Sequence, residues 1–333
     1  MLISFYGCGT SNRGSYRIHI QNLSEYFRKL GYISVIGGDP NKYEILIHDK
    51  LTTKFRNLDK VNGIITPSCD NVSVLKIVDF IIVGSIEEKC SMIKYNKNVF
   101  LFPQIEKMYL NIPRKIHQPV PQDKPLIIGY HGNQNHLNHS VCGLKCALER
   151  LSKEIKIKFV YICQNDTEWK EGRPEGVEME FKRWKYETVV KEIQKFDIGV
   201  VPNISEIEHS NKLKPNITLG KYNTDMKIRF KNKSNIGRSL VLFNLGIPVV
   251  ADITPANMHM LADPDNGYGV FDENSWYWAL KELCCEKKRN FIAENAYKES
   301  NRLYNPEKWT KSLAESIKKV YEEKMENFKS IKL

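Results

Sequence analysis

The chain has 333 residues, of which 41% are hydrophobic and 27% are charged. This composition is typical of a globular protein, and the length favours two domains that each bury a core. The net charge is +11, which favours anionic partners, but the absence of a dense basic tract or a recognisable nucleic-acid-binding motif argues against nucleic acid.

Several features predict a cytoplasmic protein. No run of about 18 apolar residues occurs, which excludes a transmembrane helix. The N-terminal sequence MLISFYGCGTSNRG lacks the basic region of a signal peptide and is expected to begin a strand. The eight cysteines form no zinc-like pair of CxxC units, so they are interpreted as reduced structural thiols.

Short apolar runs alternate with helical patterns through the first third of the chain. The predicted strands are 2–6, 33–38, 44–48, 63–68, 79–85 and 98–103. Between the first two, apolar residues from Ile18 to Leu30 are spaced for one face of a helix that ends at Gly31. This alternation predicts a parallel sheet covered by helices, in which ligands bind at the carboxyl ends of the strands.

The loop after the first strand is rich in glycine. Its glycines stand at 7, 9 and 14, so the dinucleotide fingerprint GxGxxG fails at its third position, which argues against a nicotinamide cofactor. One interpretation is a loop that shapes a small-molecule cleft, with Ser11, Arg13 and Tyr16 as polar contacts. The other is a loop in which the glycines only make the turn.

A second half of the same kind follows a proline-rich stretch. Residues 113–125 contain four prolines, as expected of a semi-rigid linker. The predicted strands of this half are 126–133, 158–163, 177–184 and 197–202, and its helices are 139–153 and 186–196. Residues 203–225 lack periodicity and are expected to form a loop.

Residues 231–251, KNKSNIGRSLVLFNLGIPVVA, predict a basic loop, a short helix, a Gly-Pro turn and a buried strand. Ser234 is suited to cap the helix. Lys231, Lys233 and Asn235 stand at the helix start, with Arg238 one turn later. Because helix N-termini and cations both favour anions, this segment predicts a diphosphate site. The alternative is a solvated basic face on a helix that packs on a sheet.

The rest of the chain is mostly helical. A short helix and a glycine turn are expected before 273–286, which is helical, and 287–324 is helical with a break near Pro306. No DxD motif lies between strands, because Asp263-Pro-Asp265 occurs late and has turn composition. We therefore expect no metal site and no metal dependence.

Four stretches resemble the two-Rossmann-domain (GT-B) glycosyltransferases, in particular the family-4-like retaining enzymes. They are YETVVKEIQKFDIGVVP, KSNIGRSLVLFNLGIPVVA, ADPDNGYGVF and LYNPEKWTKSLAESIKKVYEE. The resemblance implies an α/β fold of two Rossmann-like doubly wound domains that face a cleft. It implies an acceptor domain at 1–115, a linker at 116–125, a nucleotide-sugar donor domain at 126–305, and a helix at 306–333 that packs back on the first domain.

The resemblance also implies site residues in the second half. His131, Gly132 and Asn133 would lie near the donor phosphates, and Trp184 near the nucleotide base. A structural loop histidine and a surface tryptophan are the alternatives.

In the first half, the strand ends that face the cleft in this layout carry the acceptor-binding candidates. These are Gly9, Arg13, Tyr16, His48 and Asp49. No general base can be chosen among them.

One feature departs from the family. Its motif E-x7-E would place glutamates at Lys233 and Val241, and neither position is acidic here. In the family these glutamates contact donor sugar hydroxyls and help to align the ribose. Phosphate binding by Lys233, Asn235 and Arg238 is unaffected by this difference, whereas recognition of the sugar hydroxyls does not carry over.

The expected function is transfer of a sugar from a nucleotide-diphosphate sugar, a co-substrate, to a glycan or lipid-linked acceptor, with no cofactor. Lys233 and Arg238 would stabilise the charge of the leaving diphosphate. The basic surface would suit peripheral contact with an anionic membrane at its cytoplasmic face. The alternatives are a nucleotide-sugar epimerase, a polyol-phosphate transferase, and a non-catalytic module that binds glycan or nucleotide.

Overall fold

The computed structural model describes residues 1–51, 57, 59–66, 72–137, 141–166, 169, 172–203, 205–206, 228–229 and 235–331. The chain divides into two compact units. Unit 1 consists of Met1–Leu110, Asn235–Gly237 and Asn301–Leu333, and unit 2 of Asn111–Ser234 and Arg238–Ser300. Residues 116–125, expected to form a linker, therefore belong to unit 2.

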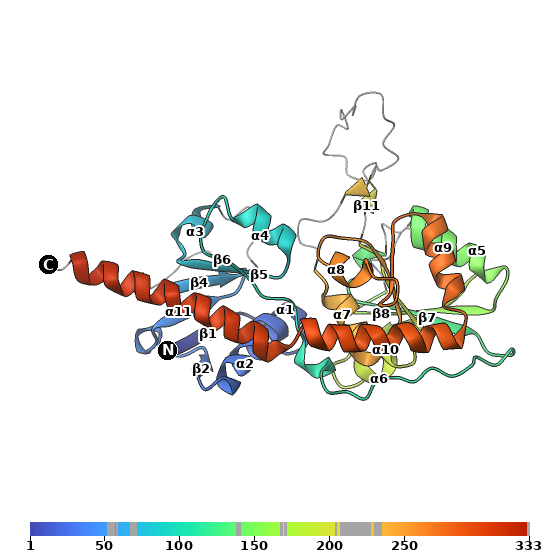
Figure 1. Ribbon diagram of the computed structural model, residues 1–333, viewed down its shortest axis with the longest axis horizontal. Helices are drawn as coiled ribbons and strands as arrows, with labels where there is room; N and C mark the ends of the chain where they lie inside the picture. Colours follow the sequence, from blue (N-terminus) through green and yellow to red (C-terminus); the bar gives the residue numbers. More distant parts are fainter. Residues whose placement is uncertain are drawn as a thin grey trace, which may run out of the picture. The chain divides into compact units, whose positions relative to one another are not determined.

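Unit 1 contains a six-stranded parallel sheet with the order β2-β1-β3-β4-β5-β6 (Figure 1). The strands are β1 (Leu2–Tyr6), β2 (Ile33–Ile36), β3 (Ile45–His48), β4 (Val61–Ile65), β5 (Phe80–Val83) and β6 (Val99–Leu101). They agree with the predicted apolar runs to within a few residues. The strand order changes direction between β1 and β3, which pair so that Tyr6 lies opposite His48.

Helices cover both faces of this sheet. One continuous helical stretch consists of α1 (Gly14–Tyr16), the π-helical η1 (Arg17–Asn22) and α2 (Leu23–Lys29). The other helices are η2 (Pro40–Lys42), α3 (Val72–Ile77), α4 (Ile86–Met92), η3 (Lys107–Tyr109) and α11 (Pro306–Ile331). On one face, η1, α2 and α11 share a core with the sheet. On the other face, α3 and α4 contribute to a second core.

Unit 2 contains a second six-stranded parallel sheet, with the order β14-β13-β10-β7-β8-β9. Its strands are β7 (Leu126–His131), β8 (Ile157–Cys163), β9 (Glu178–Arg183), β10 (Ile198–Val201), β13 (Val249–Asp252) and β14 (Tyr268–Val270). Here the order changes direction between β7 and β10. Only β14 differs in kind from the prediction, which gave that segment as a glycine turn.

The helices of unit 2 are η4 (Gln134–His136), η5 (Val141–Lys145), α5 (Cys146–Ser152), α6 (Val189–Ile193), α7 (Gly237–Leu245), α8 (Met258–Leu261), α9 (Glu273–Glu282) and α10 (Glu286–Leu303), which ends in unit 1. A two-stranded antiparallel sheet pairs β11 (Ser205–Glu206) with β12 (Ile228–Arg229). The predicted α/β fold class, with two doubly wound parallel sheets, is confirmed. None of the described helices combines the length and the apolar composition that crossing a bilayer requires.

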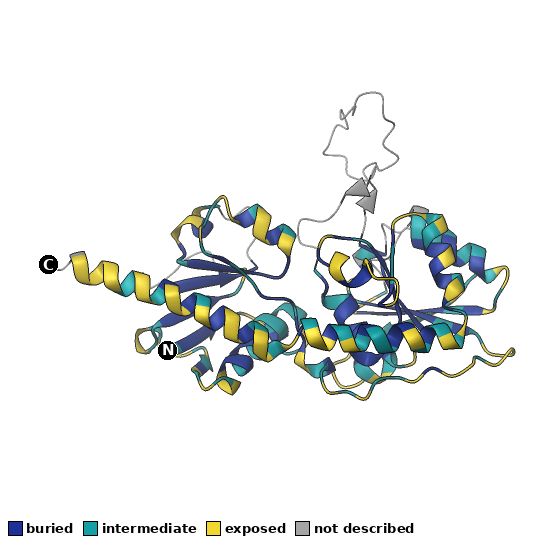
Figure 2. Cartoon of the chain, viewed as in Figure 1, coloured by how far each residue is buried: buried dark blue, intermediate teal, exposed yellow. Residues whose placement is uncertain are grey.

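Helix α11 closes one side of the unit 1 core. Leu313, Ala314 and Ile317 are buried against the sheet, whereas the opposite side of the helix is exposed (Figure 2). The break after α10 falls at Asn305-Pro306, where Asn305 Oδ1 accepts the Lys308 N–H at 3.0 Å and caps the new helix. The amphipathic pattern of α11 therefore attaches the C-terminal helix to the first sheet.

Replacing Leu313 with Ala should destabilise unit 1. The side chain is 2% exposed, and truncation of such a leucine costs about 2–5 kcal/mol through lost burial and the cavity left behind. Urea denaturation should show a lower midpoint, and amide exchange of β1 and β3 should become faster. Lys311→Ala on the exposed side of the same helix is the control. Equal stability of the two variants would contradict the packing described for α11.

Candidate functional site

The candidate site of unit 2 lies at the carboxyl ends of β7 and β10. The strand order changes direction between these neighbours, and in open α/β sheets this switch point is where ligands bind. Gly132 and Asn133 follow β7, and Pro202 and Asn203 follow β10. The first turn of α7 brings Arg238 to the same point.

The Arg238 side chain joins the two strand ends. Its Nη1 donates to the Tyr130 hydroxyl at 3.1 Å and to the Pro202 carbonyl at 3.3 Å, and its Nη2 donates to Asn203 Oδ1. A guanidinium has five N–H donors. With three hydrogen bonds to described residues, the half-buried side chain is fixed in place and still has donors for a ligand.

Tyr130 and Gly132 determine how Arg238 fits. The Tyr130 hydroxyl donates to the Asn133 carbonyl at 2.6 Å while it accepts from Arg238. Burial raises the pKa of Tyr130 to about 12, so this hydroxyl keeps its proton at neutral pH. Gly132 has a φ of +132°, and a Cβ atom there would lie 2.9 Å from Arg238 Cδ. Glycine is therefore required by both the backbone and the arginine beside it.

His131 connects β7 to the first turn of α7. Its Nε2 donates to the Arg238 carbonyl at 3.1 Å, and the side chain is 6% exposed. Burial is the main cause that lowers the His131 pKa to about 4. The imidazole is therefore neutral at pH 7, and one ring nitrogen is committed to the backbone.

A buried carboxylate positions Asn203. Asp252, at the end of β13, accepts the Asn203 backbone N–H at 2.7 Å and the Trp276 indole N–H at 3.1 Å. Asn203 in turn accepts from Arg238. The contacts thus extend across the ends of three neighbouring strands, β7, β10 and β13.

The remaining predicted residues of this half are placed as follows. Asn235 Oδ1 accepts the Gly237 N–H at 3.0 Å and shapes the turn before α7. Lys231, Lys233 and Ser234 lie outside the described residues. Trp184 follows β9, the edge strand, where its backbone N–H donates to the Cys163 carbonyl at 2.7 Å. Two strand spacings, about 10 Å, separate that strand from β7.

Sequence reasoning missed Tyr130, Asn203 and Asp252. Tyr130 lies within an apolar strand, and Asn203 opened a segment expected to be a loop. The signal that could have found them is their position. Each lies at or just beyond the carboxyl end of a strand in the middle of the sheet.

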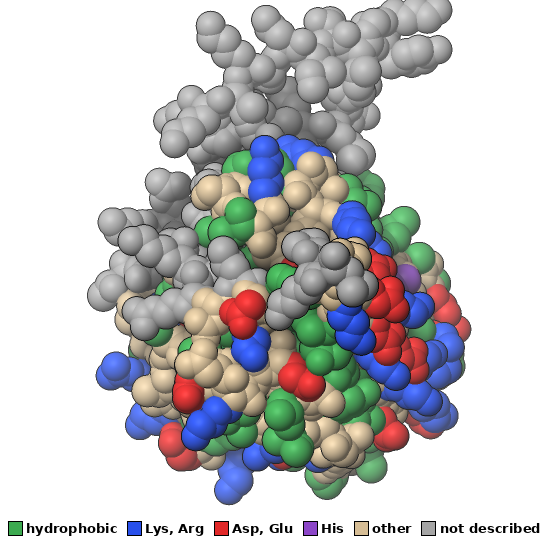
Figure 3. All heavy atoms as spheres, turned by 90° about the vertical axis from the view of Figure 1, so that its left-hand side faces the viewer, with side chains coloured by type: hydrophobic (Ala, Val, Ile, Leu, Met, Phe, Trp, Pro, Cys, Tyr) green, Lys and Arg blue, Asp and Glu red, His purple; other side chains and the backbone are tan. Residues whose placement is uncertain are grey.

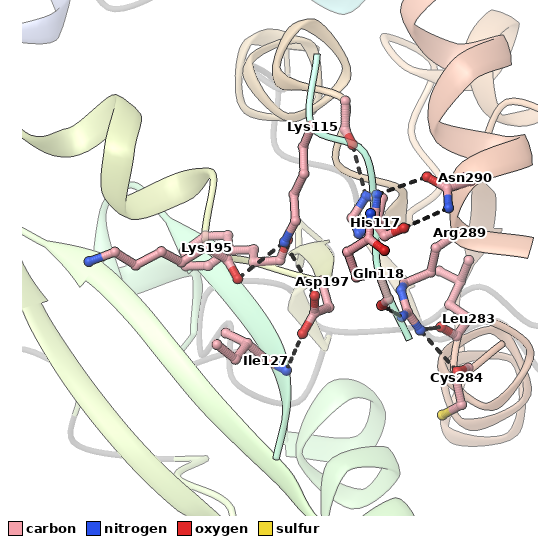
Figure 4. Close-up of polar contacts among 12 residues, drawn as sticks. Lys115, His117, Gln118, Ile127, Lys195, Asp197, Leu283, Cys284, Arg289 and Asn290 are labelled. Carbon is pink, nitrogen blue, oxygen red and sulfur yellow. Dashed lines mark hydrogen bonds and ion pairs between the residues drawn. The ribbon is translucent and has the colours of Figure 1, made fainter. Parts of the chain in front are cut away.

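The segment 111–125 holds the opposite ends of the same strands (Figure 4). Lys115 Nζ donates to the Phe196 carbonyl at 2.6 Å and pairs with Asp197 at 3.2 Å, while Asp197 accepts the Ile127 N–H at 2.9 Å. Burial lowers the Lys115 pKa, and Asp197 opposes that shift. This ion pair connects the starts of β7 and β10.

His117 holds the end of α7. Its Nε2 donates to the Gly246 carbonyl at 3.0 Å, and Asn290 of α10 bonds to both backbone groups of His117 at 2.8 and 2.9 Å (Figure 4). Gly246 has a φ of +71°, and a Cβ atom there would lie 2.2 Å from Arg114 Cγ. The helix that carries Arg238 is therefore fixed at its C-terminal end by segment 111–125.

The candidates of unit 1 lie at the switch point between β1 and β3. Arg13 Nη1 donates to the Cys8 carbonyl at 3.3 Å, and Gly9 has a φ of +153° with Tyr16 and Arg13 beside it. Asp49 accepts the backbone N–H groups of Cys8 and Leu51 at 3.0 and 2.9 Å. Arg13, Tyr16 and Asp49 line one pocket, to which Cys8, Ser15, His19, Lys50 and Leu51 also contribute.

His48 is the last residue of β3, which lies inside the sheet between β1 and β4. It is 9% exposed, its Nε2 lies 3.2 Å from Asn62 Oδ1, and its ring stacks on Tyr6 at 5.3 Å. Burial is the main cause that lowers its pKa. His48 is not among the residues that line the pocket.

Across the described part of the chain, no group of three or more His, Cys, Asp or Glu side chains has an arrangement that could hold a metal ion. Metal independence stays a prediction.

No protein-family model matches the chain, and no curated protein matches it in sequence. Solved structures match its fold over nearly its full length. Sucrose-phosphate synthase from Thermosynechococcus elongatus has a TM-score of 0.60 at 12% identity, covering 96% of this chain and 98% of its own. HepE from Anabaena, solved with UDP and glucose, has a TM-score of 0.61 at 12% identity over 96% and 100% of the two chains.

The structure described as T4 phage BGT in complex with UDP and Mn²⁺ has a TM-score of 0.61 at 13% identity, over 95% of this chain and 99% of that chain. These structures share the GT-B architecture, and the predicted resemblance in fold is confirmed. The chain has the GT-B fold.

The stability of unit 2 should fall as the pH is lowered from about 6.5 to about 4. The pKa values of His117 and His131 are both lowered from 6.5 to about 4 in the folded chain, mainly by burial. Because the unfolded chain binds protons more readily in this range, acid favours unfolding. One pKa unit corresponds to about 1.4 kcal/mol, so each histidine accounts for on the order of 3 kcal/mol at the acid end.

Denaturant unfolding of wild type and His117→Gln at several pH values checks this. Above pH 6.5 the histidine is neutral in the folded and the unfolded chain, and its protonation does not lower the free energy of unfolding. Between about pH 6.5 and pH 4 this free energy should fall less in the variant than in wild type. Identical slopes would show that His117 does not titrate as its burial implies.

Proposed function

We propose that the protein is a glycosyltransferase that moves a sugar from a nucleotide-diphosphate sugar to a glycan or lipid-linked acceptor. The observation that carries the proposal is the Arg238 guanidinium, fixed at the switch point of the second sheet in a GT-B fold. UDP is the first nucleotide to test, because structures of similar fold, including HepE and pneumococcal GtfA, were solved with it.

The chemistry follows from the charge that develops on the leaving diphosphate. As the bond between sugar and phosphate breaks, negative charge accumulates on the phosphate oxygens. A cation held in advance stabilises this state without having to reorganise. Arg238 meets that requirement because Tyr130, Pro202 and Asn203 hold it, and the N-terminus of α7 adds a partial positive charge.

In this proposal the loop before α7 completes the donor site. Lys233 joins Arg238 in stabilising the leaving group, and Lys231, Ser234 and Asn235 bind the diphosphate. Gly132 and Asn133 border the phosphates, His131 positions the first turn of α7, and Trp184 contacts the base. The acceptor binds at the pocket of unit 1, which Arg13, Tyr16 and Asp49 line, and Gly9 and His48 are further acceptor-binding residues of the proposal. Arginine and lysine would replace a metal, and the resemblance to retaining enzymes supports retention of the anomeric configuration.

Arg238→Lys and Lys233→Ala should each reduce turnover on the order of a hundredfold or more, as removal of a preorganised donor does in other enzymes. Lysine keeps the charge and part of the packing of Arg238, but it lacks the fork that spans β7 and β10. Nucleotide release from UDP-, GDP-, ADP- and CMP-sugars measures turnover, with EDTA present in one arm. Lys191→Ala, an exposed lysine of α6, is the matched control.

The outcomes separate the alternatives. Product analysis with a labelled donor distinguishes glycosyl transfer from epimerisation and from transfer of a polyol phosphate, and NMR of the product gives its configuration. Donor binding without consumption would favour the non-catalytic module. Full turnover in both variants would contradict the proposed role of the cations, and loss of turnover in EDTA would contradict metal independence.

We also propose that unit 1 contacts the cytoplasmic face of an anionic membrane, in keeping with synthesis of a surface polysaccharide or glycolipid. Ile77 and Ile93 are 55% and 56% exposed, and Lys76, Lys94 and Lys97 are exposed beside them. Asn96 Nδ2 donates to the Leu75 and Val78 carbonyls at 3.2 and 2.7 Å, which joins the ends of α3 and α4. Exposed apolar side chains between lysines suit an anionic lipid surface.

In the view of Figure 3, lysine and arginine side chains lie among acidic and hydrophobic ones. A membrane contact therefore depends on local clusters such as the ends of α3 and α4.

Cosedimentation with phosphatidylcholine vesicles, with and without phosphatidylglycerol, tests the membrane contact. The double variant Lys76→Glu and Lys94→Glu should bind the anionic vesicles about tenfold more weakly or worse, since each lysine near the surface contributes about 1 kcal/mol. The control is Lys185→Glu and Lys287→Glu, which makes the same charge change on exposed positions of unit 2. An equal loss in both pairs would show a dependence on net charge alone.

A further inference from the structure

The pocket of unit 1 has features that its expected role as an acceptor site does not explain. It lies where β1 and β3 end, at the switch point of the first sheet. The loop after β1 contributes Cys8 and Arg13, the helical stretch from Gly14 contributes His19, and the loop after β3 contributes Asp49 and Lys50. All of these residues belong to unit 1.

The cations of the pocket are not neutralised by carboxylates. Arg13 and Lys50 are both exposed. Neither forms an ion pair with a carboxylate in the described ranges, where the Arg13 side chain donates to the Cys8 carbonyl. The two side chains therefore present positive charge at the pocket.

Asp49, the carboxylate of the pocket, accepts hydrogen bonds from the backbone. One oxygen of Asp49 accepts the Cys8 N–H at 3.0 Å, and the other accepts the Leu51 N–H at 2.9 Å. These bonds tie the two loops together and direct both oxygens to main-chain donors. Asp49 thus joins the two loops, and its single negative charge does not balance the two positive charges of Arg13 and Lys50.

His19 lacks a hydrogen bond that its position calls for. Its Nε2 is buried and has no partner among the described residues. Burial, with a further contribution from Lys50, lowers the His19 pKa to about 4, so the ring is neutral at pH 7. A buried polar group without a partner is costly, and a ligand that bonds to this nitrogen removes the cost.

We infer that this pocket binds a phosphate ester of the acceptor, with Arg13 and Lys50 as its cations and His19 as a neutral hydrogen-bond partner. That the ligand is an acceptor rests on the proposed function, whereas the phosphate is inferred from the pocket itself. Arginine and lysine are the side chains that bind phosphate, and Ser15 adds a hydroxyl donor. His19 and Lys50 are new to the site.

Isothermal titration of the full chain with glycerol 3-phosphate, against glycerol, tests the inference. The phosphate monoester should bind and glycerol should not. Arg13→Ala and Lys50→Ala should each weaken binding about tenfold, as expected for loss of a charged hydrogen bond. His19→Phe keeps a ring of similar size and should weaken binding by a smaller factor. Lys29→Ala and Lys89→Ala, exposed lysines elsewhere in unit 1, are the matched controls.

A second probe, the phosphodiester glycerophosphoglycerol, identifies the source of the phosphate. Stronger binding of the monoester indicates a small phosphorylated acceptor, and stronger binding of the diester indicates a polymer or a lipid headgroup. Either result supports the inference if it is lost in the Arg13 and Lys50 variants. Equal binding of glycerol and glycerol 3-phosphate, or phosphate binding that both variants retain, overturns it.

The donor assay on the same protein separates this inference from the proposed function. If wild type releases nucleotide from a sugar donor but binds neither phosphate probe, the inference fails and the proposed function stands. If the pocket binds phosphate while no nucleotide sugar is bound or consumed, the proposed function fails and the pocket remains an anion site. Melting temperatures of the variants show that each is folded.

Discussion

The hydrogen bonds that hold Arg238 across the ends of β7 and β10 connect these two strands with the first turn of α7. Tyr130 and Asn203 accept hydrogen bonds from the guanidinium. His131 donates to the Arg238 carbonyl, and Asp252 on the next strand accepts the backbone N–H of Asn203. At the other end of α7, segment 111–125 fixes Gly246. A cation attached at so many points has little freedom left to lose when it meets an anion, which is the physical meaning of preorganisation.

Sequence patterns were sufficient for the architecture because they report local properties. Buried parallel strands are short and uniformly apolar, so both sheets and the order helix, turn and strand in 231–251 could be predicted. Strand order is not local, and Tyr130 becomes a partner of Arg238 only because β7 and β10 are neighbours. For the same reason the orphan nitrogen of His19 could not be foreseen: the residue looked like one polar position on an amphipathic helix. The three-residue strand β14 is too short to show a period.

The two switch points have the same topology, but the cation in unit 2 is held by more contacts than the cations in unit 1. In unit 2 the cation is half-buried and bonded to three neighbouring residues. In unit 1 Arg13 and Lys50 are exposed on loops, and only Asp49 is held on both of its oxygens. The diphosphate of UDP-, GDP- and ADP-sugars is the same group in each donor, so a rigid cation would suit the proposed donor site. Acceptors differ in shape, and exposed side chains can adjust to them at an entropic cost.

The burial of α7 bears on the positions at which the resembled family has its two glutamates. Val241 stands where the family-4-like enzymes that the sequence resembles have the second glutamate, and it is 5% exposed, so an apolar side chain is buried at this position. Asp252, at the end of the neighbouring strand β13, already accepts hydrogen bonds from two N–H groups. The side chains that follow β7 and β10 at this edge of the sheet, Asn133 and Asn203, are neutral amides. Neutral amides bind hydroxyls more weakly than carboxylates do, so in the proposed donor site selectivity among sugars would depend more on pocket shape than on charge.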